Sequence, residues 1–170
     1  GLDALADEPL EMRVAGKVWA PANYDNEFRG PVTAQMALEQ SLNVPTVRAA
    51  GQIGLESIVE TAGRAGIAGK LLPYPSLALG AQEVLPLEMA AAYATLANGG
   101  TRVTPTLVDR IEGPTGETTF SGSRTRTRAF DAAPAYLITV ALQGAMDRGT
   151  AASARALGFH CTAAGKTGTT

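Results

Sequence analysis

The chain has 170 residues, with 16 acidic and 14 basic side chains and a formal net charge of −2. This length is enough for one domain with a sizeable core. The slight acidic excess gives no electrostatic reason to expect nucleic-acid binding.

The first third of the chain predicts a hairpin and two successive helices. Residues 1–10 are acidic and we expect them to be irregular. Residues 11–19 alternate around a glycine, which favours a short hairpin, and residues 21–26 have the composition of a turn. Thr33 is a candidate N-cap for a helix that ends near residues 41–43. The face of this helix that we expect to be apolar carries Met36, Ala37 and Leu42.

A second helix is expected to follow at once. Asn43 is its candidate N-cap, Pro45 lies in its first turn, and Gly54 breaks it after Ile53. A third helix is expected over residues 55–65, with a loop over 66–80. A fourth, over residues 87–97, is stopped by Asn98-Gly99-Gly100. The side chains expected to face inward from this fourth helix are Leu87, Ala90, Ala91, Ala94 and Leu96.

The last third predicts a hairpin, two helices and a strand. Residues 103–111 and 117–120 alternate about Gly113-Pro114-Thr115-Gly116, which indicates a hairpin, and we expect residues 121–128 to be a solvated connector. Asp131 is expected to cap a helix to Met146 whose stripe of Tyr136, Val140 and Ala141 belongs to the core. Thr150 is expected to cap a short helix ending at Leu157. No internal repeat and no domain boundary is visible.

The final strand is expected to begin near His160 and Cys161, both partly buried. A single cysteine excludes a disulfide within the chain, and together with a single histidine it is too little for a metal site. We expect no cofactor. No apolar run approaches the ~20 residues that a membrane span needs, and no signal peptide is visible. The chain starts without Met and stops inside an expected strand, so we expect a piece of a longer protein.

The last six residues, Gly165-Lys166-Thr167-Gly168-Thr169-Thr170, combine a cation, three hydroxyls and two glycines. An ammonium and hydroxyls are suited to holding a carboxylate, and free N–H groups at a strand edge are suited to a peptide or an oxyanion. A glycine inside a strand indicates that something approaches the backbone closely. An edge strand with a solvated lysine would have the same residues, so this pattern needs a partner elsewhere in the chain.

The partner is Ser41-Leu42-Asn43, at the expected junction of two helices. Both polar side chains can point from such a junction into a cleft. Each also has an ordinary structural role open to it, Asn43 as an N-cap and Ser41 as a helix-terminal serine bonded to a carbonyl.

Together these residues resemble the second and third active-site motifs, Ser-x-Asn and Lys-Thr-Gly, of penicillin-binding proteins and serine β-lactamases. The chain resembles above all the transpeptidase domain of class A penicillin-binding proteins, and the likeness covers nearly its whole length. The segments that carry the resemblance, in chain order, are residues 19–25, 29–33, 41–45, 76–80, 86–90, 92–100 and 149–151.

The resemblance implies an α+β transpeptidase fold of the penicillin-binding-protein and β-lactamase type, here truncated to the helical lobe, a hairpin and the Lys-Thr-Gly strand. It also implies a peptidoglycan stem peptide ending in D-Ala-D-Ala as substrate, and β-lactams as ligands. Ser41 would relay a proton to the leaving amine, Asn43 would bond the substrate backbone or a catalytic lysine, and Lys166 would polarise Ser41. Thr167 and Thr169 would hold the terminal carboxylate, with the Thr169 N–H as an oxyanion donor, and Gly168 would let the acyl chain lie against the strand.

The first motif of the family, Ser-x-x-Lys, is absent, because no serine in the chain is followed three residues later by lysine. In the family this motif precedes Ser-x-Asn on a helix and supplies the nucleophile. We therefore expect residues 1–170 to be a partial transpeptidase domain that is inactive alone and whose last strand is poorly paired or pairs with the early hairpin. The parent is expected to be an enzyme fused to a glycosyltransferase domain and anchored at the extracytoplasmic, periplasmic face of the bacterial membrane.

Two other functions share these motifs. A serine β-lactamase-like hydrolase would need a water-activating carboxylate or a carbamylated lysine, and no Glu stands in a recognisable setting for that role. A non-catalytic module that binds or senses β-lactams would not require Ser41, Asn43, Lys166 and Thr169 to be intact. The presence or absence of Ser-x-x-Lys upstream would discriminate these alternatives.

Overall fold

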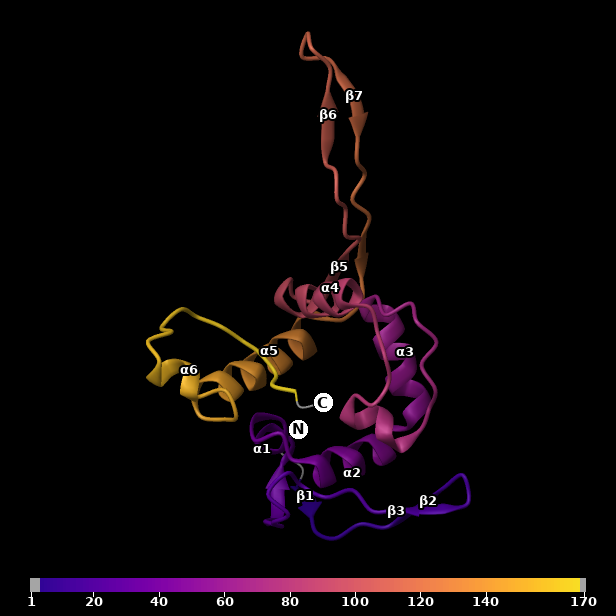
Figure 1. The fold of residues 1–170 in the computed structure, drawn as a ribbon, viewed down its shortest axis with the longest axis vertical. Helices are drawn as coiled ribbons and strands as arrows, with labels where there is room; N and C mark the ends of the chain where they lie inside the picture. Colours follow the sequence, from indigo (N-terminus) through magenta and orange to yellow (C-terminus); the bar gives the residue numbers. More distant parts are fainter. Residues whose placement is uncertain (1–3, 169–170) are drawn as a thin grey trace. The chain divides into compact units, whose positions relative to one another are not determined.

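The computed structural model of the chain describes residues 4–168 and has an α+β fold of helices and two-stranded antiparallel sheets (Figure 1). Its residues form two compact units. Unit 1 comprises residues 1–61, 70–83 and 137–170, and unit 2 comprises residues 62–69 and 84–136. Two of the four crossings between units fall inside helices, after residues 61 and 136. Because no linker composition marks those two points, the sequence shows no boundary there.

Unit 1 contains most of the N-terminal elements. Its strands are β1 (Ala4–Asp7), β2 (Met12–Val14), β3 (Lys17–Trp19) and β4 (Gly30–Thr33), and β2 and β3 form the expected hairpin. Its helical elements are α1 (Ala34–Glu39), α2 (Asn43–Ile53), the 3₁₀ turn η1 (Pro75–Leu79) and α6 (Ser153–Ala156). Helices α3 (Leu55–Ala65) and α5 (Ala132–Asp147) have residues in both units.

The core of unit 1 lies between the β1–β4 pair and helices α1 and α2. Leu5 faces Val32 across the antiparallel ladder, and both pack with Ala37 and Leu42, all four buried. The expectation that residues 1–10 are irregular was therefore wrong for β1. The strand forms because its distant pairing partner β4 places the buried side chain of Val32 opposite Leu5, which local composition does not reveal.

The side chain of Asn23 caps helix α2 from a distant part of the chain. Its Oδ1 accepts hydrogen bonds from the backbone N–H groups of Asn43 (2.9 Å) and Val44 (3.2 Å), and its Nδ2 donates to Asp7 Oδ1 (2.7 Å) and Glu27 O (2.8 Å). Asn43 was wrongly predicted to be the cap. It is the first helical residue, Leu42 holds the cap position without a side-chain bond, and Asn23 supplies the missing acceptor.

Several local predictions are confirmed. Thr33 caps α1 through a hydrogen bond from Met36 N, Pro45 lies in the first turn of α2, and Gly54 ends α2 with a φ of 95°. Helix α3 has the predicted bounds, α4 (Pro86–Ala97) begins one residue early, and α5 ends one residue late. The loop over residues 66–80 contains the turn η1, which the two prolines did not reveal.

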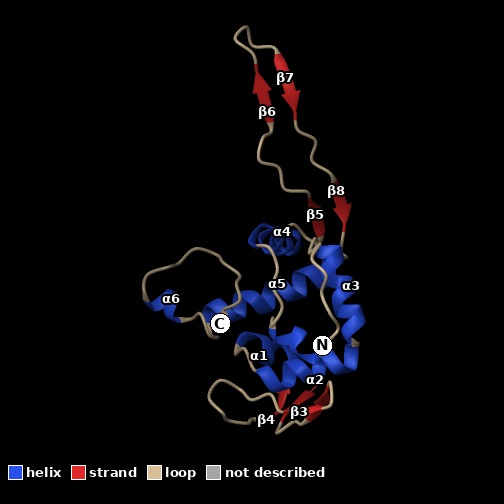
Figure 2. Cartoon of the chain, turned by 45° about the vertical axis from the view of Figure 1, so that its right-hand side comes forward, coloured by secondary structure: helices blue, strands red, loops and turns tan. Residues whose placement is uncertain are grey.

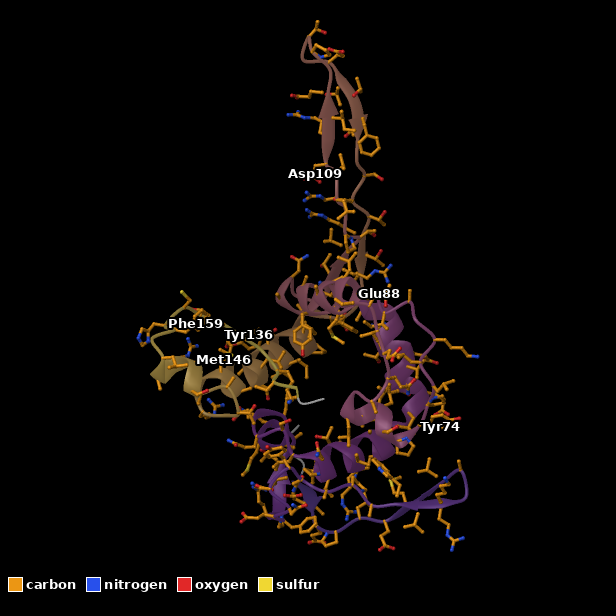
Figure 3. The ribbon with its side chains drawn as sticks, in the orientation of Figure 1. Tyr74, Glu88, Asp109, Tyr136, Met146 and Phe159 are labelled. Carbon is orange, nitrogen blue, oxygen red and sulfur yellow. The ribbon has the colours of Figure 1, made fainter. Side chains whose placement is uncertain are left out.

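The predicted inward faces are only partly right. Ala37, Leu42 and Ala141 are buried, but Met36 is exposed. Leu87 on α4 is 57% exposed, and Tyr136 on α5, which is labelled in Figure 3, is 67% exposed. The buried side chain on α4 is Thr95, whose hydroxyl donates a hydrogen bond to Ala91 O. Helical periodicity finds an apolar stripe, but the element that covers it decides which residues are buried.

Unit 2 carries a long two-stranded ribbon that continues from its base to its tip (Figure 2). At the base, β5 (Thr101–Val103) pairs with β8 (Arg126–Arg128), and toward the tip β6 (Arg110–Glu112) pairs with β7 (Thr118–Ser121). The connector predicted over residues 121–128 therefore includes a strand. Its alternating Arg and Thr side chains are all exposed, as expected for a ribbon that is solvated on both faces.

The final strand predicted from near His160 does not form in the described residues, where the segment leading to the Lys-Thr-Gly motif belongs to no sheet. The expectation that this segment is poorly paired is confirmed. Its backbone contacts α5 through Gly165 N to Leu142 O (3.1 Å). Arg155 holds the preceding loop by donating to Phe159 O (2.9 Å) and Cys161 O (2.6 Å). His160 and Cys161 are exposed, so their expected partial burial was wrong because no strand covers them.

We predict that Asn23→Ala lowers the free energy of unfolding by about 2–4 kcal/mol. The change removes four hydrogen bonds and leaves a buried carboxylate and two helix N–H groups without this partner. Urea denaturation followed by circular dichroism measures the loss. Asn98→Ala is the matched control, since Asn98 makes one exposed side-chain bond to Thr101 O, and it should cost about 1 kcal/mol or less. Equal losses in the two variants would contradict the capping role.

Candidate active site

Ser41 lies at the turn between α1 and α2 with a backbone φ of 54°. Its N–H donates to Leu38 O (3.3 Å), and the next N–H, of Leu42, donates to Ala37 O (2.9 Å). This is the double hydrogen bond of a Schellman helix end, in which glycine is the usual residue with positive φ. A serine there costs about 1 kcal/mol in backbone strain. Leu42 and Ala37, which are both buried in the core, keep the turn in this strained conformation.

The Lys166 ammonium donates a hydrogen bond of 2.6 Å to Ser41 Oγ and a second of 2.9 Å to Thr167 O. The structure therefore joins the two motifs that the sequence places 125 residues apart. Both side chains are half-buried. Burial disfavours the charged form and lowers the pKa of Lys166 below the ordinary 10.5. The contact places a positive charge against a hydroxyl whose own hydrogen is free to point elsewhere.

Asn43 lies two residues beyond Ser41 in the first turn of α2. Its Nδ2 donates to Ala22 O (2.8 Å), which fixes the orientation of the amide. Within residues 4–168 its Oδ1 accepts no hydrogen bond, so this oxygen is available to an N–H group of a ligand or of another side chain. The residues that hold Asn43 in place are Ala22 and Asn23, which the sequence indicated only as parts of a turn.

Thr167 and Gly168 are exposed, and the Thr167 hydroxyl lies 2.6 Å from the hydroxyl of Thr150. Thr150 was wrongly predicted to cap the following helix. Ala152 holds the cap position of α6, and the Thr150 hydroxyl contacts Thr167 instead. Thr169, the other predicted carboxylate ligand, lies outside the described residues.

The sequence analysis did not predict an ion pair that lies beside the site. Glu39, buried at the end of α1, forms a two-point ion pair with Arg148, including Nε to Oε2 at 2.9 Å. A signal was present, because a carboxylate in the last turn of a helix meets the negative end of the helix dipole and therefore needs a cation. The sequence could not show which of the basic residues supplies it.

A cavity of about 370 Å³ lies in unit 1 between α5 and the loop around Cys161, but neither Ser41 nor Lys166 lines it. Residues 4–168 contain no cluster of His, Cys, Asp and Glu suited to a metal ion. None of the helices in that range has both the length and the apolar character needed to cross a bilayer.

We predict that the Lys166 ammonium makes stability depend on pH. Between its lowered folded pKa and 10.5, the unfolded chain binds more protons than the folded chain, so the free energy of unfolding rises with pH in this window. The rise should disappear in Lys166→Met. Urea denaturation at several pH values, taken as the difference between the two proteins, measures it.

Two controls isolate the effect. Tyr93, whose pKa burial raises, titrates in both proteins and cancels in the difference. Lys70→Met, which removes the positive charge of an exposed lysine, is the matched control for the change of residue type. The same slope in wild type and Lys166→Met would contradict the effect of burial on Lys166.

Comparison with known proteins gives one consistent result. Residues 3–170 match the family described as the penicillin binding protein transpeptidase domain. Penicillin-binding protein 1B of Vibrio cholerae is 33% identical over 168 residues, which are 98% of this chain and 22% of that protein. The chain thus spans about a fifth of the length of such relatives.

Solved structures agree with the sequence relatives. Penicillin-binding protein 1A from Haemophilus influenzae superposes with a TM-score of 0.89 at 28% identity, covering 99% of this chain and 31% of that one. The D,D-transpeptidase domain of a peptidoglycan glycosyltransferase from Eggerthella lenta has a TM-score of 0.76 at 25% identity, covering 99% and 48%. With both motifs in contact in the structure and the family match over nearly its whole length, the chain belongs to the transpeptidase-domain family of the penicillin-binding proteins.

Proposed function

We propose that this chain is part of a D,D-transpeptidase that cross-links peptidoglycan stem peptides ending in D-Ala-D-Ala and that is acylated by β-lactams. The observation that carries the proposal is the 2.6 Å hydrogen bond from Lys166 Nζ to Ser41 Oγ, beside the exposed Thr167 hydroxyl. The names of the relatives support the proposal, since they are penicillin-binding proteins and one solved relative is a D,D-transpeptidase domain.

The contact between Lys166 and Ser41 suits proton transfer to a leaving amine. Lys166 donates to Ser41 Oγ, so the hydroxyl hydrogen of Ser41 is free to move to the nitrogen of the departing D-alanine, and Lys166 then returns a proton to Ser41. When the acceptor amine attacks the acyl-enzyme, its proton travels the same path in reverse. The lowered pKa of Lys166 makes this exchange easier than for an ordinary lysine.

The other motif residues bind the substrate in this proposal. Asn43 Oδ1 accepts an N–H of the stem peptide or of a catalytic lysine, because its Nδ2 is engaged by Ala22 O. The hydroxyls of Thr167 and Thr169 hold the terminal carboxylate, and the Thr169 N–H stabilises the oxyanion. Gly168 is exposed and lacks a side chain, so the acyl chain can lie against the backbone there.

The nucleophile is a serine of a Ser-x-x-Lys motif that lies outside these 170 residues, in the protein that carries this sequence. That protein acts at the extracytoplasmic face of the bacterial cytoplasmic membrane, anchored there and fused to a glycosyltransferase domain. The proposal needs no cofactor, because acyl transfer through a serine requires only the nucleophile, groups that carry protons, and the acceptor amine, which supplies the electron pair for the second step.

We predict that the full-length protein gains one covalent adduct with labelled penicillin and that the 170-residue chain gains none. Loss of the nucleophile from a serine enzyme's concerted set costs about 10⁶-fold in rate. Intact-mass spectrometry measures both. An adduct on the 170-residue chain would mean that one of its own serines is a nucleophile. Rapid turnover of the drug without a lasting adduct would favour a β-lactamase.

Ser41→Ala in the full-length protein is predicted to slow acylation by about 10²- to 10⁴-fold, the usual effect of a positioned proton-transfer group. The time course of adduct formation gives the rate. Ser123→Ala, at an exposed serine between β7 and β8, is the matched control and should react at the wild-type rate. A Ser41→Ala rate within about twofold of the control would contradict the proton-relay role.

A further inference from the structure

The contacts around the site close into a ring. Ser41 bonds Lys166, Thr167 contacts Thr150, and Thr150 N donates to Glu39 O (3.1 Å), two residues before Ser41. The Lys166-Thr167 pair is therefore held on one side by the end of α1 and on the other by the residues that follow α5. Of these contacts, the proposed function uses only the one between Ser41 and Lys166.

The end of α1 and the residues that follow α5 are joined by the ion pair between Glu39 and Arg148. Glu39 is 5% exposed, and its carboxylate accepts hydrogen bonds from Arg148 Nε (2.9 Å), from Arg148 Nη2 and from Gln35 Nε2 (2.7 Å). On the other side, Gln40 Nε2 donates to Arg148 O (3.1 Å). A two-point pair of this kind fixes geometry as well as adding energy, because both partners are planar. The backbone of residues 148–150 is thus set relative to α1.

Two glycines allow this close approach. A Cβ on Gly149 would lie 2.2 Å from Glu39 O, and one on Gly144 would lie 2.1 Å from Glu39 Oε1. The first of these contacts is with the backbone, which cannot move aside for a side chain, and the second is with the Glu39 carboxylate. The backbone clash means that the end of α5 can approach the end of α1 this closely only with glycine at position 149, the residue before Thr150. A side chain at position 144 would instead displace the Glu39 carboxylate from Arg148.

We propose that Thr150 is a positioning residue for carboxylate recognition by Thr167. A hydroxyl has one hydrogen to donate. If Thr167 donated to Thr150, it would have none for a ligand. When a carboxylate binds, Thr150 must be the donor in the 2.6 Å contact and Thr167 then gives its hydrogen to the carboxylate. The ring through Glu39 and Arg148 holds the Thr150 hydroxyl where it can do this.

The inference rests on the proposed function for the identity of the ligand, a peptide or β-lactam carboxylate. Its test compares acylation of the full-length protein by penicillin G and by the methyl ester of penicillin G. Thr150→Val is expected to reduce the preference for the acid over the ester by about five- to tenfold, the worth of one such hydrogen bond. Thr150→Ser, which keeps the hydroxyl, should stay within about twofold of wild type, and Thr150→Ala should match Thr150→Val.

Thr119→Val is the matched control, because the Thr119 hydroxyl bonds Ile111 O on the exposed ribbon of unit 2. It should leave the preference unchanged. A Thr150→Val variant that slows the acid and the ester equally would overturn the inference, since a purely structural defect does not distinguish the two.

A second measurement is independent of acylation. Equilibrium dialysis compares binding of an N-acyl-D-Ala-D-Ala peptide with its C-terminal amide. A carboxylate preference that wild type has and Thr150→Val lacks supports the inference, even if penicillin forms no adduct and the proposed function fails. Equal binding of both peptides by wild type, or no binding of either, overturns it.

Discussion

The site depends on one hydrogen bond, from Lys166 Nζ to Ser41 Oγ, which closes a loop of 125 residues. That bond exists because Ser41 is held in a left-handed conformation at a helix end, where its side chain projects from the turn instead of capping a helix. The turn is fixed by the burial of Leu42 in the core and by the ion pair between Glu39 and Arg148. The start of α2 is fixed by Asn23, which satisfies its first N–H groups. A half-buried cation and a half-buried hydroxyl thus acquire a defined geometry from their buried neighbours.

The parts that the sequence predicted are those set by local chemistry. Thr33 caps α1, Gly54 ends α2, and Gly116, with a φ of 84°, lies in the turn of the β6–β7 hairpin, because each of these depends on a few adjacent residues. Ser41 and Lys166 were also singled out together, since their residue types resemble a family pattern, and the structure places them in contact. Their catalytic roles stay a prediction. Their contact follows from that pattern and not from helix or strand periodicity.

The parts that the sequence did not predict depend on contacts between distant residues. Asn23 caps a helix 20 residues away, and Glu39 pairs with a residue 109 positions later. Thr150 has the local appearance of an N-cap, but its partner is Thr167. The strand β1 looked irregular because residues 1–10 are acidic, and it forms by pairing with β4, a distant part of the chain. In each case the local signal was compatible with two outcomes, and the tertiary partner selected one.

The measurement that tests the account most directly is a double-mutant cycle on the rate of acylation, with Ser41→Ala, Lys166→Met and the two combined in the full-length protein. If the two side chains act as one proton-transfer unit, the double variant reacts about as slowly as the slower single variant, because the second change removes nothing further. If the two losses in rate instead multiply, Ser41 and Lys166 act independently, and the hydrogen bond between them is not the centre of the site.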